Sequence, residues 1–262
     1  MKIGIISGSG FYEYPELEDI EKIQVNTPFG IANILKGTIK DKIVYYINRH
    51  GDKHEILSHQ VNYRANIFAL KKLEVSYILA TSVTGVAQAN LDLGKLFIFD
   101  DLYFLENRLP NGEICSIFSE IAQKDRGHLI FSTPFSNSLR NAIIESVNKL
   151  NYDFYDKGTY AHVNGPRFNS KTEIKALTQL GVSALSQTAG PEIVLAGELE
   201  IPYQLIGFGI DYANGVKEEA TSVDELNGNI VKSNVVLRNL MVDVIKKLEE
   251  VSFDNAFVYR FE

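Results

Sequence analysis

The chain has 262 residues, of which 45% are hydrophobic and 23% are charged; this composition is that of a folded globular protein and excludes a mainly disordered or fibrous one. Its 26 basic and 33 acidic residues give a net charge of −7, which argues against nucleic acid as the main partner. A single cysteine, Cys115, excludes an internal disulfide and every multi-cysteine metal site.

The spacing of apolar residues predicts an alternation of strands and helices. Short apolar or β-branched runs predict strands at residues 2–6, 32–36, 43–47, 77–81, 96–100 and 203–210. Apolar residues three and four apart predict helices at 61–73, 138–150, 171–180 and 191–199, and a long closing helix within 223–251. This alternation is typical of an α/β protein with helices on both faces of a central sheet. No repeat or linker divides the chain, so we expect one domain over residues 1–262.

Four small residues follow the first predicted strand, in the order Ser7-Gly8-Ser9-Gly10. Backbone N–H groups can approach an anion closely in such a loop, and the Ser9 hydroxyl adds a donor. The loop does not match the dinucleotide-binding pattern GxGxxG, because Glu13 occupies the place of the third glycine. From these residues alone, an anion site and an ordinary tight turn are both open.

A second motif, Arg49-His50-Gly51-x-x-His54, follows the predicted strand 43–47. The planar guanidinium of arginine matches the oxygens of phosphate. A metal site would need His50 and His54 to converge, which we expect only on a helix, whereas Gly51 indicates a loop. The alternative to an anion site is a solvated turn in which Arg49 pairs with an acidic residue.

Further polar residues lie at the predicted ends of strands or in loops. Ser82 belongs to Thr81-Ser82-Val83-Thr84-Gly85, and Thr188 precedes a predicted helix, so both hydroxyls suit an oxyanion or a turn. Phe168 and Asn169 combine a flat apolar face with an amide, which suits a planar heterocycle; the alternative is that Phe168 only anchors its loop. Asp211 follows the strand 203–210 and is either a helix cap or a working acid or base.

Together these motifs resemble the trimeric purine nucleoside phosphorylases, in particular the branch of methylthioadenosine and methylthioinosine phosphorylases. The similarity runs from Ile3 to about Val251 and rests on RHGxxH with the following VNYRAN, on GPRF at 165–168 and on TAGPE at 188–192. The resemblance implies a mixed sheet flanked by helices, a homotrimer or a pair of trimers, and phosphorolysis of a purine nucleoside. Inorganic phosphate would be a co-substrate, with no cofactor and no metal.

The resemblance also implies roles for single residues. Phosphate would be bound by Ser9, Arg49, His50, Ser82 and Thr188. The nucleoside would be held by Phe168, Asn169, Gln187, Val223, Asp211 and a neighbouring subunit's His128. His54 would lie beside the phosphate and the sugar, and Asp211 would donate a proton to N7 of the leaving purine.

The principal expectation is the reaction of 5′-methylthioadenosine and phosphate to adenine and 5-methylthioribose 1-phosphate. Asp211 favours adenine, because a carboxylate can accept from a 6-amino group, and Val223 offers an apolar wall to a methylthio group. Gln187, Ala213 and Asn164 depart from the usual methionine, second aspartate and glutamate or glutamine of this branch. Since Ala213-Asn214-Gly215 looks more like relatives that accept 6-oxopurines, the alternatives are inosine, guanosine or methylthioinosine, or a weakly active nucleoside-binding homologue.

No run of apolar residues reaches the roughly 18 that a membrane span needs, and the N-terminus carries no targeting signal. We therefore expect a cytoplasmic protein whose partners are the nucleoside, phosphate and further copies of itself. Neither a membrane nor nucleic acid is expected to bind.

Overall fold

The computed structural model describes residues 1–8, 16–249 and 251–260. Its strands are β1 (Lys2–Ser7), β2 (Glu18–Thr27), β3 (Gly30–Ile39), β4 (Lys42–Asn48), β5 (Tyr77–Val86), β6 (Leu96–Ile98), β7 (Asp101–Tyr103), β8 (Gly127–Phe131), β9 (Phe154–Tyr155), β10 (Thr159–His162), β11 (Val182–Ser186), β12 (Tyr203–Tyr212) and β13 (Ala256–Arg260). Its helices are α1 (Tyr63–Lys72), α2 (Asn137–Lys149), α3 (Lys171–Gln179), α4 (Gly190–Glu198), α5 (Val223–Lys247) and the short 3₁₀ helix η1 (Ser58–Gln60).

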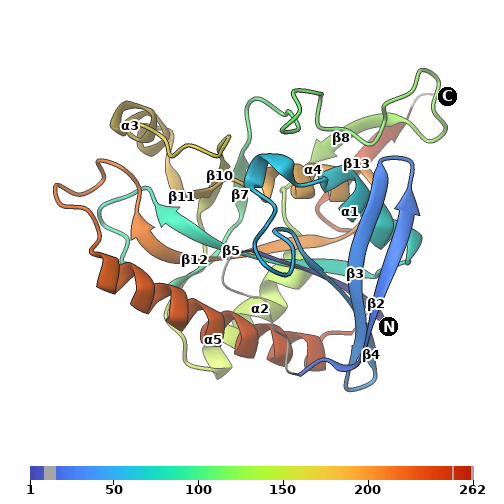
Figure 1. Ribbon diagram of the computed structural model, residues 1–262, viewed down its shortest axis with the longest axis horizontal. Helices are drawn as coiled ribbons and strands as arrows, with labels where there is room; N and C mark the ends of the chain where they lie inside the picture. The colour runs from blue at the N-terminus through green and yellow to red at the C-terminus, as the bar shows by residue number, and fades with distance from the viewer. Residues whose placement is uncertain (9–15, 250, 261–262) are drawn as a thin grey trace.

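A mixed sheet forms the centre of the molecule (Figure 1). In the described part of the chain it has eleven strands, with β2-β3-β4-β1-β5-β11-β10-β7 along its main path, β12 paired to β5 and β6, and β9 paired to β6. β1 runs parallel to β4 and β5, and β12 runs parallel to β5, so the carboxyl ends of these four strands meet at one edge. Such an edge is where sites in α/β proteins form, and it carries several of the predicted site residues.

Helices cover both faces of this sheet, with α2 and α5 on one face and α1 and α4 on the other (Figure 1). Because side chains alternate along a strand, Ile5 of β1 packs in the same core as Leu240 of α5, whereas Ile6 packs in the core that contains Ile67 of α1 and Leu195 of α4. The predicted α/β fold with helices on both faces is confirmed. Among the described residues, no helix combines the length and the apolar character needed to cross a lipid bilayer.

Two central strands are longer than the sequence predicts. β5 continues to Val86 and β12 continues to Tyr212. The two strands pair along their whole length, with a bulge between Gly209 and Asp211, and their ladder of hydrogen bonds keeps the polar residues in extended conformation. Ser82 and Asp211 therefore lie within strands and not in loops after them. The helix-cap role for Asp211 was wrong, since Ser222 caps α5.

Several strands were not predicted from the sequence, namely β2, β7, β8, β9, β10, β11 and β13. β2 shows why: it is a mostly exposed edge strand whose apolar residues, Ile20, Ile23 and Val25, are separated by polar ones, so it has no apolar run. Its conformation comes from antiparallel pairing with β3, from Glu18 opposite Thr38 to Thr27 opposite Gly30. The others are short, with five residues or fewer, and are likewise set by tertiary pairing.

Candidate active site

Arg49 follows β4 and is 1% exposed. Its Nε and Nη2 donate to the two carboxylate oxygens of Glu192 at 2.7 and 2.9 Å, and its Nη1 donates to the backbone oxygen of Thr81 at 2.8 Å. Burial by itself would lower the pKa of Arg49, but the charge and hydrogen bonds of Glu192 raise it above its ordinary value, so the guanidinium stays charged. The Arg–acid pair that the sequence left open is therefore present, and it is buried.

Gly8, which directly follows β1, packs against this guanidinium. A Cβ placed on Gly8 would lie 2.8 Å from Nη1 of Arg49 and 3.2 Å from the oxygen of Thr81, so only glycine fits there without displacement. Among the described residues, three of the five N–H groups of Arg49 take part in the bonds given above. The predicted phosphate residue Ser9 comes next in the chain and lies outside the described residues.

His50 and His54 come together although no helix joins them. Their ring centroids lie 4.6 Å apart, in a turn where Gly51 and His54 both have positive φ angles. The expectation that they could meet only on a helix was wrong, because this turn reverses the chain within four residues. In the described part of the chain, no cluster of three or more His, Cys, Asp or Glu residues is placed to hold a metal ion.

His50 is a neutral hydrogen-bond acceptor at neutral pH. Burial and the neighbouring charge of Arg49 lower the pKa of His50 to about 4. Its Nδ1 lies 2.9 Å from the backbone oxygen of Ile56, and because a carbonyl can only accept, Nδ1 carries the proton. The other ring nitrogen, Nε2, is then unprotonated and presents a lone pair.

Hydroxyl groups extend the site from Arg49 toward α4. Ser82 is 4% exposed, and its Oγ lies 3.0 Å from Oγ of Ser186, which in turn lies 2.7 Å from the hydroxyl of Tyr160. Thr188, at 5% exposed, follows Ser186 by two residues and stands directly before Ala189, the N-cap of α4. Since Glu192 of α4 holds Arg49, the side chains of Ser82 and Thr188 are brought to the same end of the sheet as the guanidinium.

Asp211 lies beside the end of β5. It is paired in register with Gly85, and a Cβ on Gly85 would lie 3.6 Å from Oδ1 of Asp211. Burial raises the pKa of Asp211 to about 6. Ser82 lies three residues before Gly85 on the same strand, which is about 10 Å along it. The structure therefore places Asp211, an acid with a raised pKa, and Ser82, which belongs to the polar residues near Arg49, on the paired strands β12 and β5.

The loop with Phe168 and Asn169 contacts the segment that follows Asp211. Nδ2 of Asn214 donates to the backbone oxygen of Asn169 at 2.8 Å. The segment Ala213-Asn214-Gly215 therefore contacts the loop that is predicted to bind the base. Phe168 itself is exposed in the single chain, as is Val223 in the first turn of α5. Gln187 binds Ser58 and the same loop, at Arg167.

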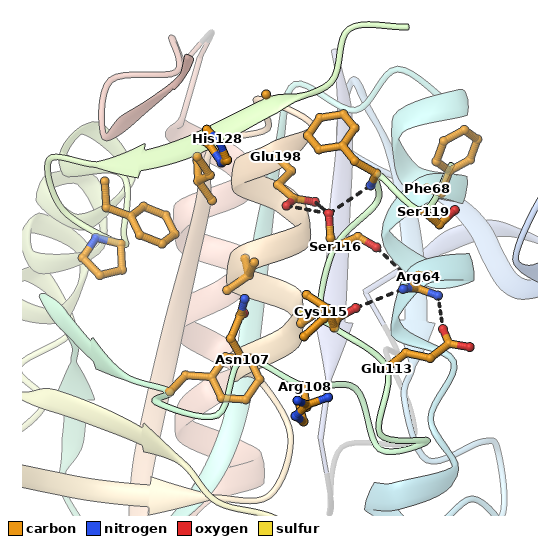
Figure 2. Close-up of a pocket in the computed structure, with 18 of the residues that line it drawn as sticks. Arg64, Phe68, Asn107, Arg108, Glu113, Cys115, Ser116, Ser119, His128 and Glu198 are labelled. Atoms are coloured by element: carbon orange, nitrogen blue, oxygen red, sulfur yellow. Dashed lines mark hydrogen bonds and ion pairs between the residues drawn. The ribbon is translucent and has the colours of Figure 1, made fainter. Parts of the chain in front are cut away.

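His128 lies apart from these residues, on β8, at the rim of an open cavity of about 1690 Å³ (Figure 2). In the same cavity Glu198 of α4 accepts hydrogen bonds from Oγ of Ser116 and from the backbone N–H of Ile117, and burial raises the pKa of Glu198. Cys115 is buried in the wall of this cavity, and burial raises the pKa of its thiol, so it is unreactive. Within one chain, His128 is not brought together with Asp211.

Sequence reasoning assigned no role to several residues that shape the site. Glu192 belongs to the TAGPE motif, and its place after Pro191 in the first turn of a predicted helix was the signal that could have identified it. Tyr203 gave no signal, yet its buried hydroxyl donates to Glu192 at 2.8 Å. Tyr160 and Ser58 likewise act through hydrogen bonds that only the tertiary fold creates.

Comparison with known proteins identifies the family. A family model described as "Phosphorylase superfamily" matches residues 2–246. The chain belongs to the phosphorylase superfamily.

Relatives within the phosphorylase superfamily include proteins named as 6-oxopurine nucleoside phosphorylases, as S-methyl-5′-thioadenosine phosphorylases and as a probable S-methyl-5′-thioinosine phosphorylase. The chain is 34% identical over 252 residues to a probable 6-oxopurine nucleoside phosphorylase of Dictyoglomus turgidum; the aligned region covers 95% of this chain and 92% of that protein. It is 32% identical over 257 residues to an S-methyl-5′-thioadenosine phosphorylase of Ciona intestinalis, covering 97% and 90%. Among solved structures, methylthioadenosine phosphorylase of Schistosoma mansoni in complex with adenine superposes with a TM-score of 0.84 at 26% identity, over 94% of this chain and 91% of that one.

Proposed function

We propose that the chain catalyses the phosphorolysis of a purine nucleoside, with 5′-methylthioadenosine as its principal substrate. The observation that carries this proposal is Asp211, a carboxyl beside the end of β5 whose pKa burial raises to about 6. In its protonated form this group can donate to N7 of a purine, and as a carboxylate it can accept from the 6-amino group of adenine. The methylthioadenosine phosphorylases among the relatives support the same substrate.

Phosphate binds in this proposal where Arg49, His50, Ser82 and Thr188 gather, with Ser9 and the backbone of the loop after β1. The hydroxyls of Ser82 and Thr188 donate to phosphate oxygens, and the positive end of the α4 dipole stabilises the anion. Glu192 balances the charge of Arg49 when phosphate is absent. His54 lies beside His50 and faces the phosphate and the sugar.

The reaction transfers the sugar from nitrogen to oxygen. An oxygen of phosphate attacks C1′ as the bond between C1′ and N9 breaks, and the electron pair of that bond moves into the purine. Asp211 donates its proton to N7, so that the purine leaves as a neutral base; such general acid catalysis contributes about 10²–10⁴-fold. The bound phosphate dianion stabilises the positive charge that develops on the sugar. The products are adenine and 5-methylthioribose 1-phosphate, and no cofactor or metal takes part.

A second candidate keeps the chemistry and changes the base to a 6-oxopurine. Asn214 favours it, because its amide contacts the loop that carries Phe168 and Asn169, and an amide can donate to a keto oxygen. The probable 6-oxopurine nucleoside phosphorylases among the relatives support this candidate.

The proposal includes a homotrimer, or two trimers joined as a hexamer, in the cytoplasm, acting in purine salvage. In one chain His128 is remote from Asp211, and in the trimer it reaches the sugar site of a neighbouring subunit. Light scattering coupled to size-exclusion chromatography measures the assembly. A monomer that turns over nucleoside at full rate would contradict the role of His128.

The test of function is a panel of methylthioadenosine, adenosine, methylthioinosine, inosine and guanosine, each with and without phosphate. We expect phosphate-dependent release of adenine from methylthioadenosine at the highest kcat/KM. Preference for the inosine compounds or guanosine establishes the second candidate. Binding without phosphate-dependent release of any base would overturn both and indicate a nucleoside-binding homologue.

A further inference from the structure

Gln187 joins two loops that belong to different parts of the candidate site. Its Oε1 accepts a hydrogen bond of 2.9 Å from Oγ of Ser58, and its Nε2 donates one of 3.1 Å to the backbone oxygen of Arg167. Ser58 is the first residue of η1, which follows His54 in the same loop, and Arg167 directly precedes Phe168. One amide side chain therefore connects the phosphate-side loop (residues 49–60) to the base-side loop (residues 164–170).

The packing around this bridge is close. A Cβ placed on Gly165 would lie 2.0 Å from Oε1 of Gln187 and 2.5 Å from Oγ of Ser58, so the two polar groups occupy the space that a side chain would need. Ser58 and the backbone that carries Gln187 are also anchored. The hydroxyl of the buried Tyr63 donates to the backbone oxygen of Ser58 at 3.2 Å, and Gln187 itself follows Ser186, whose Oγ contacts Ser82.

We propose that Gln187 is a positioning residue that fixes the base-side loop against the phosphate-side loop. The inference rests on the proposed function, because phosphorolysis requires the nucleoside and the phosphate to be held at one separation. A small displacement between reacting groups lowers the rate steeply. Gln187 acts through Ser58 and Arg167 and needs no contact with the reacting atoms. Loss of its hydrogen bonds raises KM for the nucleoside and lowers kcat, each by about three- to tenfold, the range that one or two hydrogen bonds account for.

The first experiment measures the two loops without any turnover. Amide hydrogen exchange followed by mass spectrometry compares the wild type with Gln187→Met, a variant of similar length that loses both hydrogen bonds. We expect faster exchange in both loops, with an unchanged rate in the central strands. Gln187→Glu keeps an acceptor for Ser58 but loses the donor to Arg167, so it should loosen the base-side loop alone. Unchanged exchange in Gln187→Met would overturn the inference.

The second experiment is a double-mutant cycle of Gln187→Leu with Ser58→Ala, read out as KM for the nucleoside and kcat; leucine is used because methionine is the usual residue of this branch at position 187. Because each substitution breaks the same bridge, the double variant should be no worse than Gln187→Leu alone. Ser58→Thr keeps a hydroxyl and should restore the wild-type values. If the fold-changes of the two single variants multiply in the double variant, the two residues act independently and the proposed bridge is wrong.

The matched control is Gln179→Met, the same chemical change at an exposed position at the end of α3. It should leave hydrogen exchange of both loops and the kinetics at wild-type values. The two proposals fail separately: a wild type without phosphorolysis refutes the function, whereas unchanged hydrogen exchange in Gln187→Met refutes the bridge whether or not the chain is active.

Discussion

Arg49 and Glu192 form a buried two-pronged ion pair that connects the end of β4 to the first turn of α4. Their side chains are 0% and 1% exposed, so neither charge is screened by water. The pair links two segments that supply the predicted phosphate residues His50 and Thr188. It therefore sets both the stability of this end of the sheet and the geometry of the anion site.

Glu192→Gln should destabilise the fold strongly, because it leaves the charge of Arg49 buried without its partner. Breaking a buried pair in this way costs about 3–5 kcal/mol of the free energy of unfolding. Denaturant unfolding measures it. Glu200→Gln is the control, since Glu200 pairs with Arg260 at the surface and such pairs are worth less than about 1 kcal/mol. Equal losses of unfolding free energy in the two variants would show that the buried pair stabilises the fold no more than the surface pair does.

Arg49→Lys tests the role of the guanidinium in phosphate binding. Lysine keeps the positive charge but cannot bind Glu192 with two nitrogens and still present further donors. We expect KM for phosphate to rise by about ten- to a hundredfold, the value of a lost hydrogen bond to a charged group. KM for the nucleoside should change by less than threefold. A phosphate KM at the wild-type value would mean that Arg49 serves only the structure.

Phosphate binding should take up protons through His50. In the free protein His50 is neutral, with a pKa lowered to about 4 and an unprotonated Nε2. An unprotonated phosphate oxygen can accept a hydrogen bond from Nε2 only if His50 gains a proton, and the anion's charge favours the protonated ring. Calorimetric titration at pH 7.5 in buffers of different ionisation enthalpy should show net proton uptake, which is lost in His50→Asn. Binding heats that do not depend on the buffer would show instead that His50 stays neutral and that the P–OH group of the dianion donates to Nε2.

The sequence predicted most of the central fold because apolar periodicity is strong where both faces of the sheet are covered. It missed edge and short strands such as β2 and β10, whose conformation depends on pairing with distant segments. For the site, residue type and order were informative for Arg49 and Asp211. The partner of Arg49, the close approach of the His50 and His54 rings and the bridge through Gln187 depend on contacts that no local pattern encodes.

The pH dependence of stability should report Asp211. An unfolded aspartate releases its proton near pH 4, whereas burial raises the pKa of Asp211 to about 6 in the folded chain. Between these values the unfolded state binds fewer protons, so the contribution of Asp211 to stability falls as pH rises through this window, by at most about 3 kcal/mol. The free energy of unfolding of Asp211→Asn minus that of the wild type should therefore increase from pH 4 to pH 6 and stay constant above pH 6. A difference independent of pH would contradict the raised pKa.

Asp211→Asn also tests catalysis and base selection together. An amide holds no transferable acidic proton, so phosphorolysis of methylthioadenosine should slow by about 10²–10⁴-fold. The wild-type kcat/KM should decline above pH 6 as the free carboxyl loses its proton, and the variant should lack this decline. Because the amide can donate to a keto oxygen, the ratio of kcat/KM for methylthioinosine over methylthioadenosine should rise at least tenfold. Asp211→Glu, which keeps the acid, is the control and should retain the pH profile. An unchanged ratio in Asp211→Asn would show that another residue reads the base.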